Sequence, residues 1–98
     1  MSNGVLRVLI ADDEPIIRLD LKNMLESLGY EVIAEAGDGV SAVEAARTLK
    51  PDVAILDIKM PGMDGIDVAR ELGRAAQRPA VIFVTAFDQF AVSAFEVE

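Results

Sequence analysis

Hydrophobic residues fall into four short runs, separated by longer stretches in which apolar residues recur at helical spacing. The runs are rich in β-branched side chains and end at turn-forming or acidic residues, as is typical of strands in a sheet that is covered on both faces. We therefore predict strands over residues 5–11, 31–36, 53–57 and 80–86. Acidic residues at the start and near the end of the second run favour an edge position for that strand.

Between these runs, the spacing of apolar residues predicts helices over about 15–28, 40–49, 65–72 and 88–95. The residues predicted to face inward in the first three helices are Ile17, Leu21, Met24, Leu25 and Leu28, then Val43, Ala46 and Leu49, then Ile66, Ala69 and Leu72. Strands that alternate with helices predict an α/β fold, in which right-handed crossovers build a parallel sheet with helices on both faces.

Polar residues add detail to two of the predicted helices. Asp64 precedes the third helix and can cap its first turn. In the first helix, we expect Arg18 and Lys22 to pair with acidic residues of the same helix, namely Glu14 and Glu26.

The composition limits the chemistry that the chain can perform. Its 98 residues predict a single domain over 1–98, and the absence of cysteine and histidine excludes disulfides, thiolate or imidazole metal sites and the usual general base. A bound metal must then have oxygen ligands, which favours Mg²⁺, Ca²⁺ or Mn²⁺. A net charge of −8 argues against direct binding to nucleic acid. No apolar run approaches a membrane span and residues 1–4 lack a basic signal-peptide head, so we expect a soluble cytoplasmic protein without a membrane partner.

Three carboxylates are expected to meet at one edge of the sheet. Asp12 and Asp13 follow the first strand, Asp57 ends the third, and ligands of open α/β sheets bind beyond the carboxyl ends of the strands. Two like charges ~4 Å apart repel by about 4 kcal/mol at an effective dielectric of ~20, so either a proton or a divalent cation should be held there. Asp57 could then be the nucleophile that accepts a phosphoryl group, with Thr85 and backbone amides after Asp57 as hydrogen-bond donors to it.

The chain resembles the receiver domain of a two-component response regulator. The resemblance rests on the acidic pair Asp12-Asp13, on Asp57, on the loop Met-Pro-Gly-Met-Asp-Gly at 60–65 and on Thr85-Ala86, in this order and at this spacing. It implies a flavodoxin-like (CheY-like), doubly wound parallel sheet of strand order 2-1-3-4-5. The chain ends at residue 98, before the fifth strand and helix of the family, so we expect an incomplete fold of strand order 2-1-3-4 without an output domain.

The resemblance also implies roles for individual residues. Asp57 would accept the phosphoryl group from a histidine kinase or a phosphotransfer protein, and Thr85 would be the switch hydroxyl that moves toward it. Asp12, Asp13 and Asp57 would hold Mg²⁺, together with the backbone carbonyl of Lys59. The chain would catalyse only its own phosphorylation and dephosphorylation and would not otherwise be an enzyme.

Two departures from the family pattern matter for this interpretation. No lysine follows Thr85, although the family has one that pairs with the phosphoryl group, and losing a donor of this kind typically costs roughly 2.7–4 kcal/mol. The fourth strand, Ala80 to Val84, is also expected to form an uncovered apolar edge. Because such an edge can pair with another chain, we expect self-association.

Several alternatives stay open at this stage. Residues 9–43 resemble receivers attached to RNA-binding antiterminator domains, whereas 81–98 resemble receivers attached to LytTR-type DNA-binding domains, which indicates a mosaic or a truncated fragment. An engineered fragment is a third possibility for the origin of the chain. A receiver-like interaction or dimerisation module that is never phosphorylated is the main functional alternative. A hydrolase of the haloacid-dehalogenase type would need an acid at the position of Lys59, and a dinucleotide-binding fold would need a Gly-x-Gly-x-x-Gly motif after the first strand.

Overall fold

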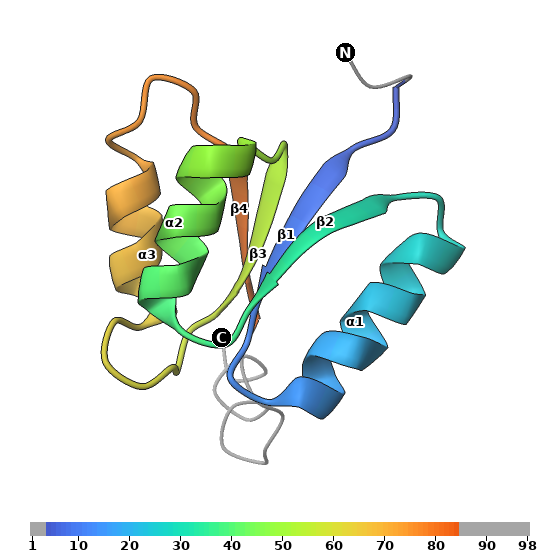
Figure 1. Cartoon of the computed structure of the whole chain (residues 1–98), viewed down its shortest axis with the longest axis horizontal. Helices are drawn as coiled ribbons and strands as arrows, with labels where there is room; N and C mark the ends of the chain where they lie inside the picture. The colour runs from blue at the N-terminus through green and yellow to red at the C-terminus, as the bar shows by residue number, and fades with distance from the viewer. Residues whose placement is uncertain (1–3, 85–98) are drawn as a thin grey trace, which may run out of the picture.

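The computed structural model describes residues 4–84, which form a parallel sheet with helices on both faces (Figure 1). The elements are β1 (Arg7–Ala11), α1 (Pro15–Ser27), β2 (Glu31–Ala36), α2 (Gly39–Leu49), β3 (Val53–Asp57), α3 (Gly65–Leu72) and β4 (Ala80–Val84). The strand order β2-β1-β3-β4 confirms the predicted α/β class, the 2-1-3-4 topology and the edge position of β2. The predicted helix over 88–95 lies outside the described residues.

The pairing of the two central strands positions the chemistry. Strands β1 and β3 are parallel neighbours, and Ala11 lies opposite Leu56 at their carboxyl ends. The next residue of each strand is acidic, so this register brings Asp12 and Asp57 to the same edge of the sheet. On its other side, β1 pairs with β2, where Ala11 lies opposite Ala36.

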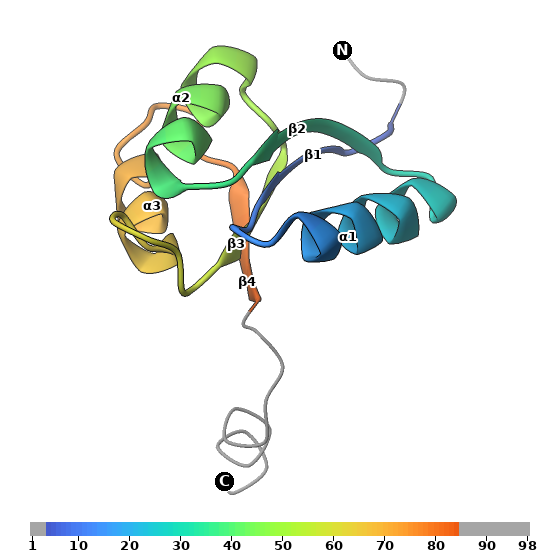
Figure 2. The same ribbon diagram turned by 60° about the horizontal axis from the view of Figure 1, so that its bottom comes forward.

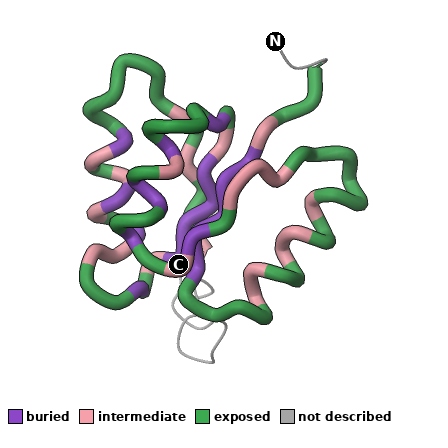
Figure 3. Tube along the Cα trace, in the orientation of Figure 1, coloured by how far each residue is buried: buried purple, intermediate pink, exposed green. Residues whose placement is uncertain are grey.

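Helices α2 and α3 cover one face of the sheet and α1 covers the other (Figures 1 and 2). Alternate residues of the central strands point to opposite faces, as the pleat of a strand requires. Leu9 and Leu56 belong to the core beneath α2 and α3, whereas Ile10 and Ile55 pack with the α1 side. Both central strands are buried almost throughout, whereas no residue of α1 is buried (Figure 3).

Some predicted core positions differ in the structure. Val43, Ala46 and Leu72 are buried as expected. The inward prediction is wrong for the exposed residues Met24, Leu28, Leu49 and Ile66. Met24 lies on α1, which covers its face of the sheet only partly, and Leu28 is the residue directly after this helix. Leu49 is the last residue of α2.

The rotation of α3 explains why Ile66 is exposed. The buried residues of this helix are Gly65, Val68 and Leu72, which share one face. A Cβ atom at Gly65 would collide with the carbonyl oxygen of Asp57, so the backbones of α3 and β3 approach closely at this point. This contact turns Val68 inward and Ile66 outward.

Candidate acidic site at the carboxyl edge of the sheet

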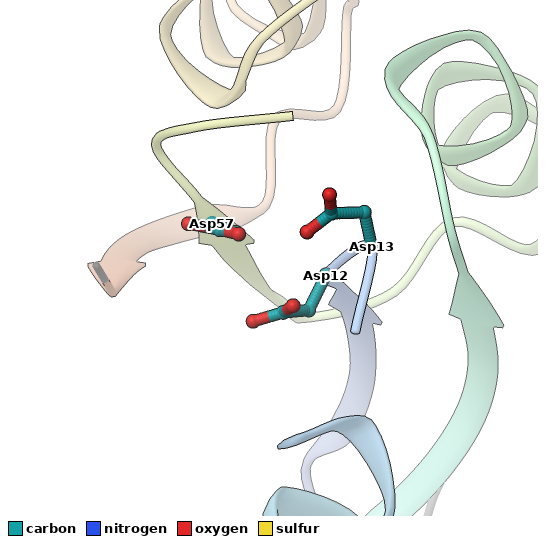
Figure 4. Close-up of side chains that lie close together, drawn as sticks. All are labelled: Asp12, Asp13 and Asp57. Carbon is teal, nitrogen blue, oxygen red and sulfur yellow. The ribbon is translucent and has the colours of Figure 1, made fainter. Parts of the chain in front are cut away.

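Asp12, Asp13 and Asp57 form one cluster at the carboxyl ends of β1 and β3, as predicted (Figure 4). One carboxylate oxygen from each residue lies within 4.8 Å of the other two. The side chains differ in environment, because Asp12 and Asp57 are only 3% and 4% exposed whereas Asp13 is on the surface. The cluster therefore has a buried floor and one solvent-facing carboxylate.

Three hydrogen bonds hold Asp12 in place at the end of β1. Its N–H donates to the carbonyl of Ala36 on β2 at 3.0 Å. Its Oδ1 atom accepts a hydrogen bond from the N–H of Glu14 at 2.8 Å, which satisfies part of the buried carboxylate. The guanidinium of Arg18 donates to its backbone carbonyl at 2.7 Å.

Asp57 is held by the loop that follows β3. Its Oδ1 atom accepts a hydrogen bond from the N–H of Lys59 at 3.1 Å. The intervening residue, Ile58, donates to Val84 on β4 at 2.9 Å and accepts from Gly65 on α3 at 3.0 Å. The loop thus ties the carboxyl end of β3 to a neighbouring strand and to the start of α3.

Burial raises the pKa of the Asp57 carboxyl above its usual range. The hydrogen bond from the Lys59 N–H opposes this effect, while the negative charges of Asp12, Asp13 and Glu14 add to the increase in pKa. Loss of the proton from Asp57 is therefore less favourable in the folded chain than in water.

The donor set of the cluster fits a hard divalent cation. All the side-chain donors are carboxylate oxygens, which are the ligands that Mg²⁺ prefers, and the 4.8 Å limit on their separation allows one ion to reach all of them. Within 4–84, this is the one group of acidic side chains that meets the geometric criterion for a metal site. The role of the Lys59 carbonyl stays a prediction, and Thr85 lies outside the described residues.

Two features around the cluster were not predicted from the sequence. Arg18 and Lys22 pair with Glu35 of β2, at 3.6 Å and 3.7 Å, and the predicted pairs with Glu14 and Glu26 are wrong. The close approach of Gly65 to Asp57 was also missed. A glycine directly after the capping residue Asp64 was the available signal, because a residue without a side chain permits such contacts.

No helix in the described part of the chain has the length and apolar character needed to cross a membrane.

Comparison with known proteins gives consistent matches. A family model described as "Response regulator receiver domain" matches residues 8–98. The transcriptional regulatory protein PdtaR of Mycobacterium tuberculosis is 54% identical over 83 residues, which cover 85% of this chain and 40% of that protein. The positive alginate biosynthesis regulatory protein of Pseudomonas aeruginosa is 47% identical over 94 residues, which cover 94% of this chain and 38% of that protein. The chain thus spans about two fifths of the length of these curated relatives.

Solved structures give the same result. The response regulator domain of Thermotoga maritima CheB aligns with a TM-score of 0.78 at 35% identity, covering 93% of this chain and 71% of that chain. The crystal structure of a CheX-CheY-BeF3-Mg²⁺ complex from Borrelia burgdorferi aligns with a TM-score of 0.80 at 31% identity, covering 92% of this chain and 70% of that chain.

Proposed function

Because the chain belongs to the family of response regulator receiver domains, we propose that Asp57 accepts a phosphoryl group from a histidine kinase or a phosphotransfer protein. The observation that carries this proposal is the cluster of Asp12, Asp13 and Asp57, whose oxygens lie within 4.8 Å of one another at the carboxyl edge of the sheet. The chemistry of this donor set suits Mg²⁺ as the cofactor, and the Borrelia complex, described with both BeF3 and Mg²⁺, supports the same assignment.

In this proposal, a carboxylate oxygen of Asp57 forms a bond to phosphorus as the bond between phosphorus and the donor's nitrogen breaks. The hydrogen bond from the Lys59 N–H holds the Asp57 carboxylate in one orientation for this attack. The carboxylates of the cluster and the backbone carbonyl of Lys59 would hold Mg²⁺. When bound, Mg²⁺ would neutralise negative charge on the carboxylates and on the phosphoryl oxygens.

The remaining roles follow from the same proposal. Thr85 acts as the switch hydroxyl, and the chain catalyses only its own phosphorylation and dephosphorylation. It acts in the cytoplasm, where a kinase supplies the phosphoryl group. The proposal concerns this receiver domain alone, which spans about 40% of the length of the regulatory protein PdtaR. The resemblance of residues 9–43 and of residues 81–98 to two different classes of receiver stays a prediction.

Intact-mass measurement tests the proposal. The full chain is incubated with Mg²⁺ and acetyl phosphate, and we expect an adduct of about 80 Da, the mass of one phosphoryl group. Asp57→Asn should abolish the adduct. Asp20→Asn, which makes the same chemical change on α1 away from the cluster, should retain it.

Two outcomes would contradict the proposal. An adduct of equal yield in Asp57→Asn would place the phosphoryl group on another residue. No adduct in a chain shown to be folded and to bind Mg²⁺ would favour the alternative, an interaction or dimerisation module that is not phosphorylated.

A further inference from the structure

The side chain of Arg18 lies directly behind the acidic pair. It extends from α1, and its Nη1 atom donates to the backbone carbonyl of Asp12 at 2.7 Å. Its Nε atom lies 3.6 Å from Oε1 of Glu35 on β2, and the side chain is only 22% exposed. The planar guanidinium therefore links α1, the end of β1 and β2 in one contact.

The contact with Asp12 concerns the peptide bond between the two acidic residues. The carbonyl that accepts from Arg18 belongs to the Asp12–Asp13 peptide, so its direction determines how both side chains leave the backbone. The preceding N–H of Asp12 is already fixed by Ala36 on β2, at 3.0 Å. Arg18 fixes the other side of Asp12, and Glu35 holds Arg18 in turn.

Gly37 leaves space for this arrangement. A Cβ atom at this position would lie 3.3 Å from Nη1 of Arg18, closer than most such contacts in proteins. The backbone of Gly37 is not in the left-handed region, so its conformation does not itself require glycine. A side chain at position 37 would require the guanidinium to shift by a few tenths of an ångström or more, without removing any charge.

We propose that Arg18 is a positioning residue for the metal site, which fixes the Asp12–Asp13 peptide so that both carboxylates are oriented before a divalent cation binds. This inference rests on the proposed function, because it assumes that the cluster binds Mg²⁺. The planar shape of the Arg18 guanidinium, rather than its charge, is what orients the peptide, because a guanidinium can donate to two acceptors in a fixed plane and a lysine ammonium cannot.

If Arg18 is replaced by a neutral residue, an electrostatic role and a positioning role predict opposite changes in the affinity for a divalent cation. If only charge mattered, removing the positive charge of Arg18 should strengthen the binding of a cation, because the guanidinium repels the cation. Removing a group that orients the ligands should weaken it, and loss of an outer partner typically lowers metal affinity about 10–100-fold. Lys22 provides a matched control, because its Nζ atom lies 3.7 Å from the other oxygen of the same Glu35.

The experiment measures the Kd for Mg²⁺ by titration calorimetry in the full chain, with Mn²⁺ binding followed by electron paramagnetic resonance. We expect about tenfold weaker binding in Arg18→Met, and little recovery in Arg18→Lys, which keeps the charge but lacks the planar guanidinium. Lys22→Met should bind as tightly as the wild type or more tightly. Gly37→Val keeps every charge and should weaken binding several-fold, which tests the geometry even if Arg18→Met fails to fold.

The possible results separate the two proposals. A folded wild-type chain that binds neither Mg²⁺ nor Mn²⁺ would overturn the metal site itself. A wild-type chain that binds, with Arg18→Met and Gly37→Val binding equally well, would overturn the positioning role alone. Full recovery of binding in Arg18→Lys would show that charge is sufficient and would likewise overturn it.

Discussion

Asp57 is nearly fully buried, and this burial opposes the ionisation of its carboxyl group. Removing the charge should therefore stabilise the fold when no metal is present. We expect Asp57→Asn to raise the free energy of unfolding at pH 7 in EDTA by roughly 1 kcal/mol or more, since like charges within a few ångströms repel by at least this amount at an effective dielectric of ~20. Urea unfolding followed by circular dichroism measures the change.

The same residue gives a pH dependence whose sign is known. Its pKa is higher in the folded chain than in the unfolded chain, so protonated Asp57 stabilises the fold. That contribution is complete below the unfolded pKa of about 3.9 and is lost as the pH rises through the folded pKa. The advantage of Asp57→Asn should thus grow with pH over this range and disappear in acid. An advantage of the same size at pH 3 and pH 8 would contradict the role of ionisation.

Gly65 is the residue at which the fold and the site depend on the same contact. A Cβ atom there would collide with the carbonyl oxygen of Asp57 and lie 2.8 Å from its carbonyl carbon. We expect Gly65→Ala to lower the free energy of unfolding by about 2–4 kcal/mol, because backbone must shift to accept the methyl group. The amide resonances of Asp57 and Ile58 should shift as well.

Gly73→Ala is the matched control for this substitution. Gly73 follows α3 in right-handed helical conformation, and a Cβ there would make contacts of 3.4 Å. Its replacement should be neutral or stabilise by roughly 0.5 kcal/mol through the unfolded state. An equal loss of stability in both variants would argue against a specific clash at Gly65.

At the residue scale, the cluster itself could be predicted from the sequence but its supporting contacts could not. Asp12, Asp13 and Asp57 end neighbouring parallel strands, and such ends must lie at one edge of a sheet. The partners of Arg18 depend on how far α1 lies from β2, because its long side chain can reach either its own helix or the next strand. Helical spacing alone therefore predicted Glu14 as the partner of Arg18, whereas the partner is Glu35.

Among the elements, α3 has the best-defined start. Its capping box consists of the Asp64 carboxylate, which accepts from the Asp67 N–H at 2.9 Å, and the Asp67 carboxylate, which accepts from the Asp64 N–H at 3.3 Å. We expect Asp64→Ala to lower the free energy of unfolding by about 1 kcal/mol, as is usual for the loss of a helix N-cap. Asp64→Asn retains an acceptor oxygen and should recover most of the loss in the same urea titration. If Asn is no better than Ala, the hydrogen bond is not what stabilises this helix.

Helix and strand positions were predictable at this scale, but the rotation of each helix was less so. The buried face of α2 contains Ala42 and Val43, and that of α3 contains Val68. Of these residues only Val43 belongs to a predicted face, because the predicted faces contained Leu49 and Ile66 in place of Ala42 and Val68. The spacing of apolar residues shows which broad side of a helix is apolar. Local contacts, such as that of Gly65 with the Asp57 backbone, determine which residues of that side meet the sheet.

At the scale of the whole molecule, β4 presents an apolar surface. Ile82 and Phe83 are 51% and 42% exposed, and within 4–84 no strand lies beyond β4 in the sheet. A cavity of about 250 Å³ adjoins this strand on the α1 side, lined by Leu6, Val8, Leu25, Tyr30, Val53, Ile55 and Ile82. The expected self-association through β4 therefore stays a prediction with a defined surface.

Sedimentation equilibrium tests this prediction. We expect the full chain to associate reversibly as its concentration rises, and Ile82→Lys to shift the equilibrium toward the monomer, because a charge on an exposed strand opposes pairing between chains. Ile66→Lys, a change of the same kind on the exposed side of α3, is the control and should not alter association. A wild-type chain that remains monomeric at high concentration would rule the interface out.

The central position of β1 has a consequence for how the protein is made. Among the described strands, this one is synthesised before the others, yet one of its neighbours is β3. The hydrogen bond between Arg7 and Asp52 joins residues that are 45 positions apart. At a translation rate of about 5–20 residues per second, one edge of β1 would wait roughly 2–9 s for its partner to emerge from the ribosome. During that interval the apolar segment Val8–Ala11 would be available to chaperones that bind nascent chains, so the yield of native protein in a cell should depend on them more than the small size of the domain suggests.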